Sequence, residues 1–239
     1  MVENSPYPLA PALAVPLAGI LGMNVALALW LQSNFGLSAL APALSALTLI
    51  GTLALSEPVR RIHGPTRLGP ADAVTLFRSL WVGAAACFID TDPTPTTATL
   101  VMGITAIALA LDGLDGLVAR RTQTSSIFGA QLDMELDAAL MMVLSALVWT
   151  WGQAGPWVLT AGLLRYVWVG STRFLPWMRR PLPPWKWRKT ACVIATAGLL
   201  FALGPWMPVP LAATATGVLW LSFGADFVWL FQRRTEGIE

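Results

Sequence analysis

Charged residues are scarce in this chain: Asp, Glu, Lys and Arg together make up only 12% of its 239 residues. That is about half of the ~25% that soluble domains usually carry. Histidine occurs once and cysteine twice, with no metal-type spacing, which argues against a disulfide framework and against a zinc or copper centre. The first residues lack the basic start of a secretory signal, so no cleaved signal peptide is expected.

Long apolar runs take the place of the missing charge. Hydrophobic residues make up 56% of the chain, and a helix needs ~20 mostly apolar residues to cross a bilayer. Eight runs qualify, at roughly 9–32, 36–56, 72–90, 96–119, 129–152, 156–175, 189–205 and 210–231. Pro11 and Pro16 predict a kink or a break in the first of them. The sequence therefore predicts an all-α, polytopic membrane protein.

The basic residues fall in alternate loops. Their groups are Arg60, Arg61 and Arg67; Arg120 and Arg121; Arg179, Arg180, Lys186, Arg188 and Lys189; and Arg233 and Arg234. The intervening loops contain neither Lys nor Arg. Because loops rich in Lys and Arg stay on the cytoplasmic side, both termini are predicted to be cytoplasmic, in a multi-pass protein of the plasma (inner) membrane.

Four aspartates interrupt the apolar pattern of the fourth and fifth runs: Asp112, Asp115, Asp133 and Asp137. An ionised carboxylate in or near a bilayer is costly unless it is compensated. Residues three or four apart share a helix face, and the short connection 120–128 favours antiparallel neighbours, so the two acidic stripes are expected to converge. Carboxylate oxygens suit Mg²⁺ or Mn²⁺. The sequence predicts a cytoplasmic site that holds one or two such ions.

Small residues lie beside the aspartates, at Gly116, Ala119 and Gly129. They would let a ligand approach the backbone closely, although small residues also allow tight packing of membrane helices. Glu135 is predicted to point away from the cluster, toward a neighbour or the interface.

The spacing of these residues resembles a family signature. The sequence reads Asp112-x-x-Asp115-Gly116-x-x-Ala119-Arg120, then eight residues, then Gly129-x-x-x-Asp133-x-x-x-Asp137. Every fixed letter and gap is similar to the signature of the CDP-alcohol phosphotransferase family. The resemblance implies a six-helix membrane core at residues 66–239. Residues 1–65 would then form two further transmembrane helices, to which the sequence assigns no role.

The resemblance also implies a reaction. Members of that family transfer a substituted phosphate from a CDP-linked donor, often CDP-diacylglycerol, to an alcohol hydroxyl and release CMP. The implied metal ligands are Asp112, Asp115, Asp133 and Asp137, with Asp137 also the general base. The residues expected at the donor are Gly116, Ala119, Arg120, Ser126, Gly129, Asp72 and Thr75. The last two belong to the run Asp72-x-x-Thr75-x-x-Arg78, which resembles a pattern that faces the nucleotide in relatives.

The acceptor is less well defined. Arg165 lies well inside an apolar run, so it should face the protein interior or a wet cavity. Together with Arg173, Arg188 and Lys189 it would form a basic pocket for a phosphorylated alcohol such as glycerol 3-phosphate or an inositol phosphate. Alternatively, Arg165 pairs with an acidic group such as Asp226, and the loop cations only set topology. The partners expected are the donor lipid, the alcohol, the bilayer and, as in relatives, a second copy in a homodimer; no nucleic acid is expected.

Three other interpretations compete with this one. A membrane prenyltransferase also binds Mg²⁺ and a pyrophosphate donor, but it does not require the Gly-x-x-Ala-Arg continuation. A cation transporter would hold its ions near the bilayer midplane, often between internal repeats, which the sequence does not show. A decayed, noncatalytic relative would not be expected to keep all four aspartates.

Overall fold

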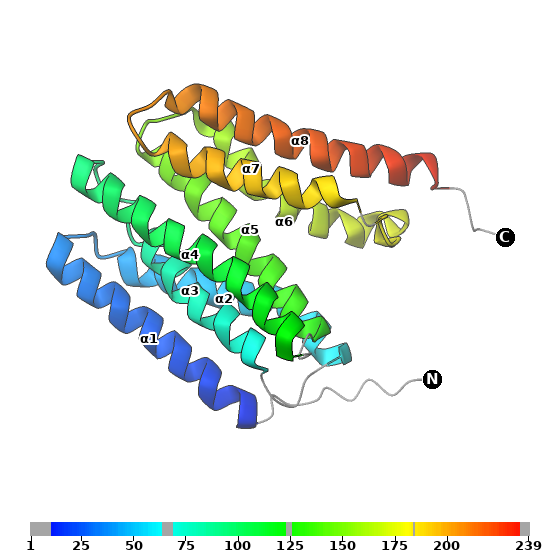
Figure 1. Ribbon diagram of the computed structural model, residues 1–239, viewed down its shortest axis with the longest axis horizontal. Helices are drawn as coiled ribbons and strands as arrows, with labels where there is room; N and C mark the ends of the chain where they lie inside the picture. The colour runs from blue at the N-terminus through cyan, green and yellow to red at the C-terminus, as the bar shows by residue number, and fades with distance from the viewer. Residues whose placement is uncertain (1–10, 64–68, 123–125, 184, 235–239) are drawn as a thin grey trace. The chain divides into compact units, whose positions relative to one another are not determined.

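The computed structural model describes residues 11–63, 69–122, 126–183 and 185–234, with side chains described except at 11–12, 61–63, 114–122 and 186. Within these ranges there are eight α-helices and no strand (Figure 1). The α-helices are α1 (Pro11–Phe35), α2 (Ala41–His63), α3 (Pro70–Ala86), α4 (Pro95–Thr122), α5 (Ile127–Thr150), α6 (Leu159–Phe174), α7 (Lys186–Ala202) and α8 (Pro208–Gln232). Two short 3-10 helices, η1 (Pro156–Val158) and η2 (Pro176–Arg179), flank α6.

Each predicted apolar run coincides with one α-helix, which confirms the all-α expectation. Among the described residues, four segments are long and apolar enough to cross a membrane: Leu13–Phe35, Ala41–Arg60, Pro95–Gly113 and Pro208–Gln232. The other four helices are either shorter or more charged. Helices α3, α6 and α7 have only 17, 16 and 17 residues, and α5 carries three carboxylates in its first half.

Helix α1 continues through Pro16, so the predicted break does not occur there. Proline lacks a backbone N–H and costs the helix one hydrogen bond. The other residues around it are apolar and helical on both sides. The first span is thus one helix from Pro11 to Phe35.

The exterior of the helices is apolar. Val15 and Leu221 are each 75% exposed and Val167 is 61% exposed. Proteins dissolved in water rarely expose so many large apolar side chains along consecutive helices. Together with the long apolar spans, this surface identifies a polytopic membrane protein.

The chain divides into two compact units, Met1–Leu140 and Met141–Glu239. In the first unit, α3 packs against α1, α2 and α4. A buried apolar cluster there joins Leu49 of α2, Leu76 of α3, and Phe128 and Leu132 of α5. These helices build the site described below.

In the second unit, α7 packs against α8, and α6 also contacts α8. Gly198 of α7 permits close approach, because an added Cβ would lie 3.0 Å from the Cβ of Ala215 on α8. Trp220 of α8 donates an indole hydrogen bond of 3.0 Å to the hydroxyl of Thr160 on α6. Small residues and interhelical hydrogen bonds are the usual means of helix association in a membrane.

Candidate functional site

Helix α3 supplies the cation of the site. The helix starts with Pro70 in its first turn, and the carboxylate of Asp72 accepts a hydrogen bond of 2.8 Å from the backbone N–H of Gly69. This contact satisfies one of the backbone donors that every helix start leaves open. Arg78 follows almost two turns later, and its side chain is only 1% exposed. A charged residue buried to this extent requires compensation.

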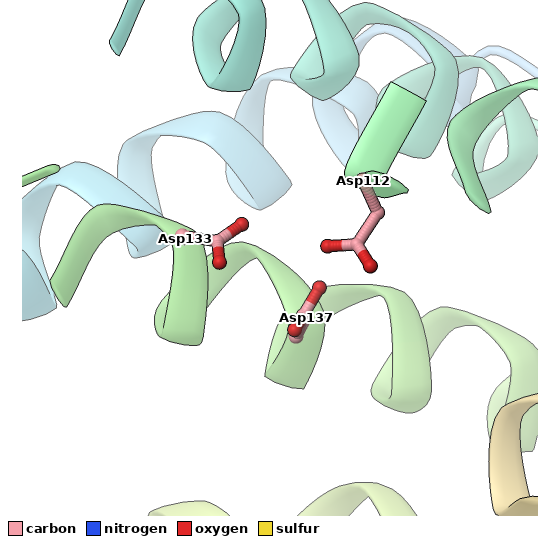
Figure 2. Close-up of side chains that lie close together, drawn as sticks. All are labelled: Asp112, Asp133 and Asp137. Carbon is pink, nitrogen blue, oxygen red and sulfur yellow. The ribbon is translucent and has the colours of Figure 1, made fainter. Parts of the chain in front are cut away.

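Three carboxylates provide that compensation. Asp112 comes from α4, and Asp133 and Asp137 lie one turn apart on α5 (Figure 2). One oxygen of each lies within 4.8 Å of the other two. The predicted convergence of the two acidic stripes is therefore confirmed for these three residues. It follows from helix periodicity, since positions four apart point to the same side.

The guanidinium of Arg78 joins the three carboxylates. Its Nη1 donates to Oδ1 of Asp112, and its Nη2 lies 2.8 Å from Oδ1 of Asp137 and 2.9 Å from Oδ1 of Asp133. Two like charges 4 Å apart repel by about 4 kcal/mol at an effective dielectric constant of about 20. Three carboxylates so close together would separate without a cation among them. The planar, multidentate guanidinium is well suited to bridge several carboxylates.

Exposure differs between the two sides of the cluster. The Arg78 side chain is 1% exposed, those of Asp112 and Asp133 are each 35% exposed, and that of Asp137 is 52% exposed. The carboxylates are therefore open on the side away from Arg78. A ligand would reach the carboxylates, and Asp137 most readily, without displacing the helices.

The donor set fits a hard divalent cation. Its atoms are carboxylate oxygens from three residues, with no nitrogen or sulfur ligand in the group, and Mg²⁺ and Mn²⁺ prefer such ligands. The carboxylates are already close enough to share an ion, and they already face a positive charge. Asp112, Asp133 and Asp137 are thus the described residues that could hold a metal.

Several predicted site residues lie at the end of α4. Asp115, Gly116, Ala119 and Arg120 belong to the helix, but their side chains fall outside the described part of the structure. Their predicted contacts with metal and donor stay predictions.

A second group of predicted residues joins the starts of α3 and α5. The hydroxyl of Ser126 accepts a 2.8 Å hydrogen bond from the backbone N–H of Gly129, the usual geometry of a helix N-cap. The same hydroxyl donates to Oδ1 of Asp72 at 3.5 Å. A Cβ at Gly129 would overlap that Asp72 oxygen. In this structure the space beside Gly129 holds Asp72, as the helix-packing interpretation expects.

Thr75 and Glu135 are also buried. The hydroxyl of Thr75 bonds back to the carbonyl of Ala71 at 3.2 Å, and Thr75 is 3% exposed. Glu135 accepts a 2.6 Å hydrogen bond from the amide of Gln131, one turn earlier on α5. Glu135 therefore has a neighbour on its own helix, in line with its predicted orientation away from the cluster.

The predicted acceptor residues all lie in the second unit. Arg188 at the start of α7 forms an ion pair of 2.8 Å with Asp226 of α8 and lies over the ring of Trp185. Asp226 thus pairs with Arg188, whereas the alternative interpretation paired it with Arg165. Arg173 occupies the last turn of α6, and Lys189 is exposed in the first turn of α7. Their convergence on an acceptor stays a prediction.

Arg78 is the residue whose role the sequence did not reveal. Its place in a helix-opening pattern suggested a position near the nucleotide, whereas the structure shows that it forms ion pairs with three aspartates. The available signal was a lone arginine inside an apolar run, the same signal that singled out Arg165. Such a residue must find anionic partners, but periodicity within one helix does not identify them.

Comparison with known proteins agrees with this geometry. The model of the family described as CDP-alcohol phosphatidyltransferase matches residues 69–227, from just before α3 into α8. No curated protein and no solved structure shows significant similarity to the chain. The match covers more than half of the chain and includes every aspartate of the cluster. The chain therefore belongs to the CDP-alcohol phosphatidyltransferase family.

Proposed function

We propose that this chain transfers a phosphatidyl group from CDP-diacylglycerol, or a similar CDP-linked lipid, to the hydroxyl of a small alcohol. Family membership supports transfer from a CDP-alcohol within a membrane. The observation that carries the proposal is the convergence of Asp112, Asp133 and Asp137 from two helices, open to a ligand on one side. In the reaction, the alcohol oxygen bonds to the lipid-bearing phosphorus and the bond from that phosphorus to the CMP oxygen breaks. CMP leaves with the electron pair, and the hydroxyl proton passes to the protein.

We assign the aspartates to two tasks. Asp112, Asp115, Asp133 and Asp137 would hold two Mg²⁺ or Mn²⁺ ions. When bound, such ions neutralise the charge of a pyrophosphate and stabilise the departing phosphate oxygen. Asp137 would also accept the proton of the alcohol. Its greater exposure supports this assignment, because a general base must come within hydrogen-bond reach of the attacking hydroxyl.

Arg78 would keep the carboxylates converged. It contacts all three from the buried side, so it leaves their exposed sides available. Phosphoryl transfer depends mainly on positioning and on electrostatic stabilisation. An arginine that fixes the ligands before the substrate arrives contributes to both.

The remaining assignments follow the family signature and the positions of the basic residues. Gly116, Ala119 and Arg120 would contact the nucleotide or its phosphates, near Thr75 and the joint formed by Asp72, Ser126 and Gly129. The cations Arg165, Arg173, Arg188 and Lys189 would bind a phosphorylated acceptor. Residues 66–239 would form the catalytic core, with its active site and both termini on the cytoplasmic side of the plasma membrane, and two copies would form a homodimer.

The test is a transfer assay with the purified protein in nanodiscs. CDP-diacylglycerol is supplied with Mn²⁺ or Mg²⁺ and with glycerol 3-phosphate, inositol, inositol phosphate, serine or choline in turn. We expect CMP release with at least one alcohol, and its loss on chelation. A polyprenyl pyrophosphate donor should give no product. Absence of CMP with every alcohol, or product from the prenyl donor, would contradict the proposal.

A further inference from the structure

Two helices lie outside the family match yet contact the site helices. Helices α1 and α2 precede residue 69, where the match begins. Both pack against α3, which carries Arg78, and against each other (Figure 1). They are therefore neighbours of the site without belonging to the part of the chain that defines the family.

A buried polar contact links the three helices. Asn24 of α1, Ser45 of α2 and Ser79 of α3 are exposed by only 1%, 1% and 2%. The amide of Asn24 donates to the hydroxyl of Ser79 at 3.5 Å and accepts from the hydroxyl of Ser45 at 3.4 Å. Polar side chains between membrane helices bond to one another because lipid offers no alternative partner. These contacts favour one rotation of α3.

Gly83 of α3 determines how closely α1 and α2 approach α3 beside Asn24 and Ser45. A Cβ at position 83 would overlap the side-chain oxygens of Asn24 and Ser45. Gly83 lies one turn after Ser79 on α3, so both face the N-terminal helices. The close approach of α1 and α2 to α3 thus requires the absence of a side chain at this position.

Apolar packing extends the contact to α5. Leu49 of α2 belongs to one buried cluster with Leu76 of α3 and Leu132 of α5. Around the cluster pack Leu17, Ile20, Leu21 and Leu53, all from α1 and α2. Leu132 directly precedes Asp133, and Ser79 directly follows Arg78. The N-terminal helices therefore contact the neighbours of both the cation and one of its anions.

We propose that α1 and α2 are a positioning clamp, which sets the rotation and depth of α3 so that Arg78 reaches Asp112, Asp133 and Asp137. Because successive residues of a helix are 100° apart, holding Ser79 against Asn24 directs Arg78 to a different side, toward α4 and α5. A small rotation of α3 would withdraw the guanidinium and let the carboxylates separate. The inference rests on the proposed function, because it takes the cluster to be a metal site.

The experiment measures the Mn²⁺ dissociation constant of the full-length protein by electron paramagnetic resonance. Gly83→Ala should push α3 away from the clamp and weaken Mn²⁺ binding by roughly 10-fold or more, the effect usual for the loss of an outer-shell partner. Gly103→Ala on α4 is the matched control, because nothing lies within 4 Å of a Cβ at that position. Its dissociation constant should equal that of the wild type.

Asn24→Ala provides the second variant. Alone it removes the hydrogen bonds without adding bulk, and it should weaken Mn²⁺ binding in the same direction. Combined with Gly83→Ala it removes one of the two side-chain oxygens that the new methyl group would overlap, so the double variant should bind Mn²⁺ more tightly than Gly83→Ala alone. A purely structural role would reduce the number of folded sites and leave the dissociation constant of the remaining sites unchanged.

The outcomes separate the two proposals. If the wild type does not bind Mn²⁺, the proposed metal site fails before the clamp is tested. If the wild type binds Mn²⁺ and Gly83→Ala binds it equally well, the clamp is overturned. Should Gly83→Ala fail to fold, Asn24→Ala decides: unchanged Mn²⁺ affinity in that variant contradicts the clamp, and weaker binding supports it.

Discussion

The guanidinium of Arg78 contacts carboxylates from two helices, and its own exposure is 1%. Neither partner would be stable there alone. A buried guanidinium without anions is strongly destabilising, and three carboxylates within 4.8 Å of one another repel. Arg78 and the three carboxylates therefore stabilise one another. The guanidinium already supplies part of the positive charge that a metal ion would supply. A bound divalent metal ion and Arg78 should consequently both stabilise the folded protein.

Arg78→Met should destabilise the protein, and added Mn²⁺ should restore part of the loss. Breaking a fully buried ion pair costs ~3–5 kcal/mol, but these carboxylates are one-third to one-half exposed, so we expect roughly 1–3 kcal/mol in EDTA. Thermal unfolding in EDTA and in Mn²⁺ measures the difference. Arg60→Met is the control, since Arg60 pairs with Glu57 on its own helix. The stability change caused by Arg60→Met should be the same with and without Mn²⁺. If Mn²⁺ also fails to reduce the destabilisation caused by Arg78→Met, the prediction is wrong.

Asp137→Asn should abolish most turnover without unfolding the protein. The amide keeps the size of the side chain but cannot accept a proton from the alcohol, and loss of a general base typically costs roughly 10²–10⁴-fold in rate. CMP release under saturating substrates measures the effect. Asp92→Asn, in an exposed loop position, should retain full activity. Near-normal turnover of Asp137→Asn would assign the proton transfer elsewhere.

The sequence predicted the aspartates but not their arginine, for a physical reason. Asp133 and Asp137 are four residues apart on one helix, so local geometry alone places them on one face. The partner of Asp112 lies 34 residues earlier in the chain. Such a contact depends on how α3 rotates against α4, and that rotation is set by packing with other helices. Gly129 illustrates the same limit, because its neighbour Asp72 comes from a different helix.

At the scale of elements, helix existence was more predictable than helix ends. Each of the eight apolar runs coincides with a helix in the described part of the chain, because spanning length and hydrophobicity are properties of a local window. Several observed helix ends differ from the predicted ones. Helix α4 continues to Thr122, beyond the predicted 119, and α7 ends at Ala202, before Gly204 and Pro205. Helix α3 ends at Ala86 and not at residue 90, because the next backbone N–H groups bond in tight turns.

The joint between α3 and α5 should depend on Gly129. Gly129→Ala would place a methyl group against the Asp72 carboxylate, so it should lower the melting temperature of the protein even without ligands. Ser126→Ala should cost about 1 kcal/mol through loss of the N-cap. Thermal unfolding of each variant in the absence of substrate checks both effects, with Gly103→Ala as the open-space control.

The result also separates two interpretations of Gly129. If the glycine serves helix packing, Asp72→Ala should relieve the methyl group, and the double variant should unfold at a higher temperature than Gly129→Ala alone. If the glycine serves only ligand access, Gly129→Ala should unfold like the wild type and raise the KM for the donor.

At the scale of the whole molecule, several of the basic residues lie near the ends of helices, as Arg233 and Arg234 do at the end of α8. In the second unit, Arg233 lies 4.4 Å from the ring centroid of Trp229, and Arg234 lies 3.9 Å from that of Phe231. Arginine over an aromatic ring is a favourable pair, and both residue types are typical of the membrane interface. These contacts are those expected of an interfacial anchor at the end of α8. The basic residues predict that this end faces the cytoplasm.

That orientation can be tested by labelling single cysteines. Replacing the exposed Cys192 with serine leaves only Cys87, which is fully buried. In this background, Asp92→Cys reports the loop between α3 and α4, which has no basic residue, and Gln232→Cys reports the end of α8. A membrane-impermeant maleimide on intact cells should label Asp92→Cys at once and Gln232→Cys only after permeabilisation. The opposite pattern, or labelling of both in intact cells, would contradict a cytoplasmic C-terminus.

Because the positive-inside rule acts on Lys and Arg near the helix ends, the double variant Arg233→Glu with Arg234→Glu should weaken the preference of the C-terminus for the cytoplasmic side. In the same assay, a larger fraction of Gln232→Cys should then be labelled in intact cells.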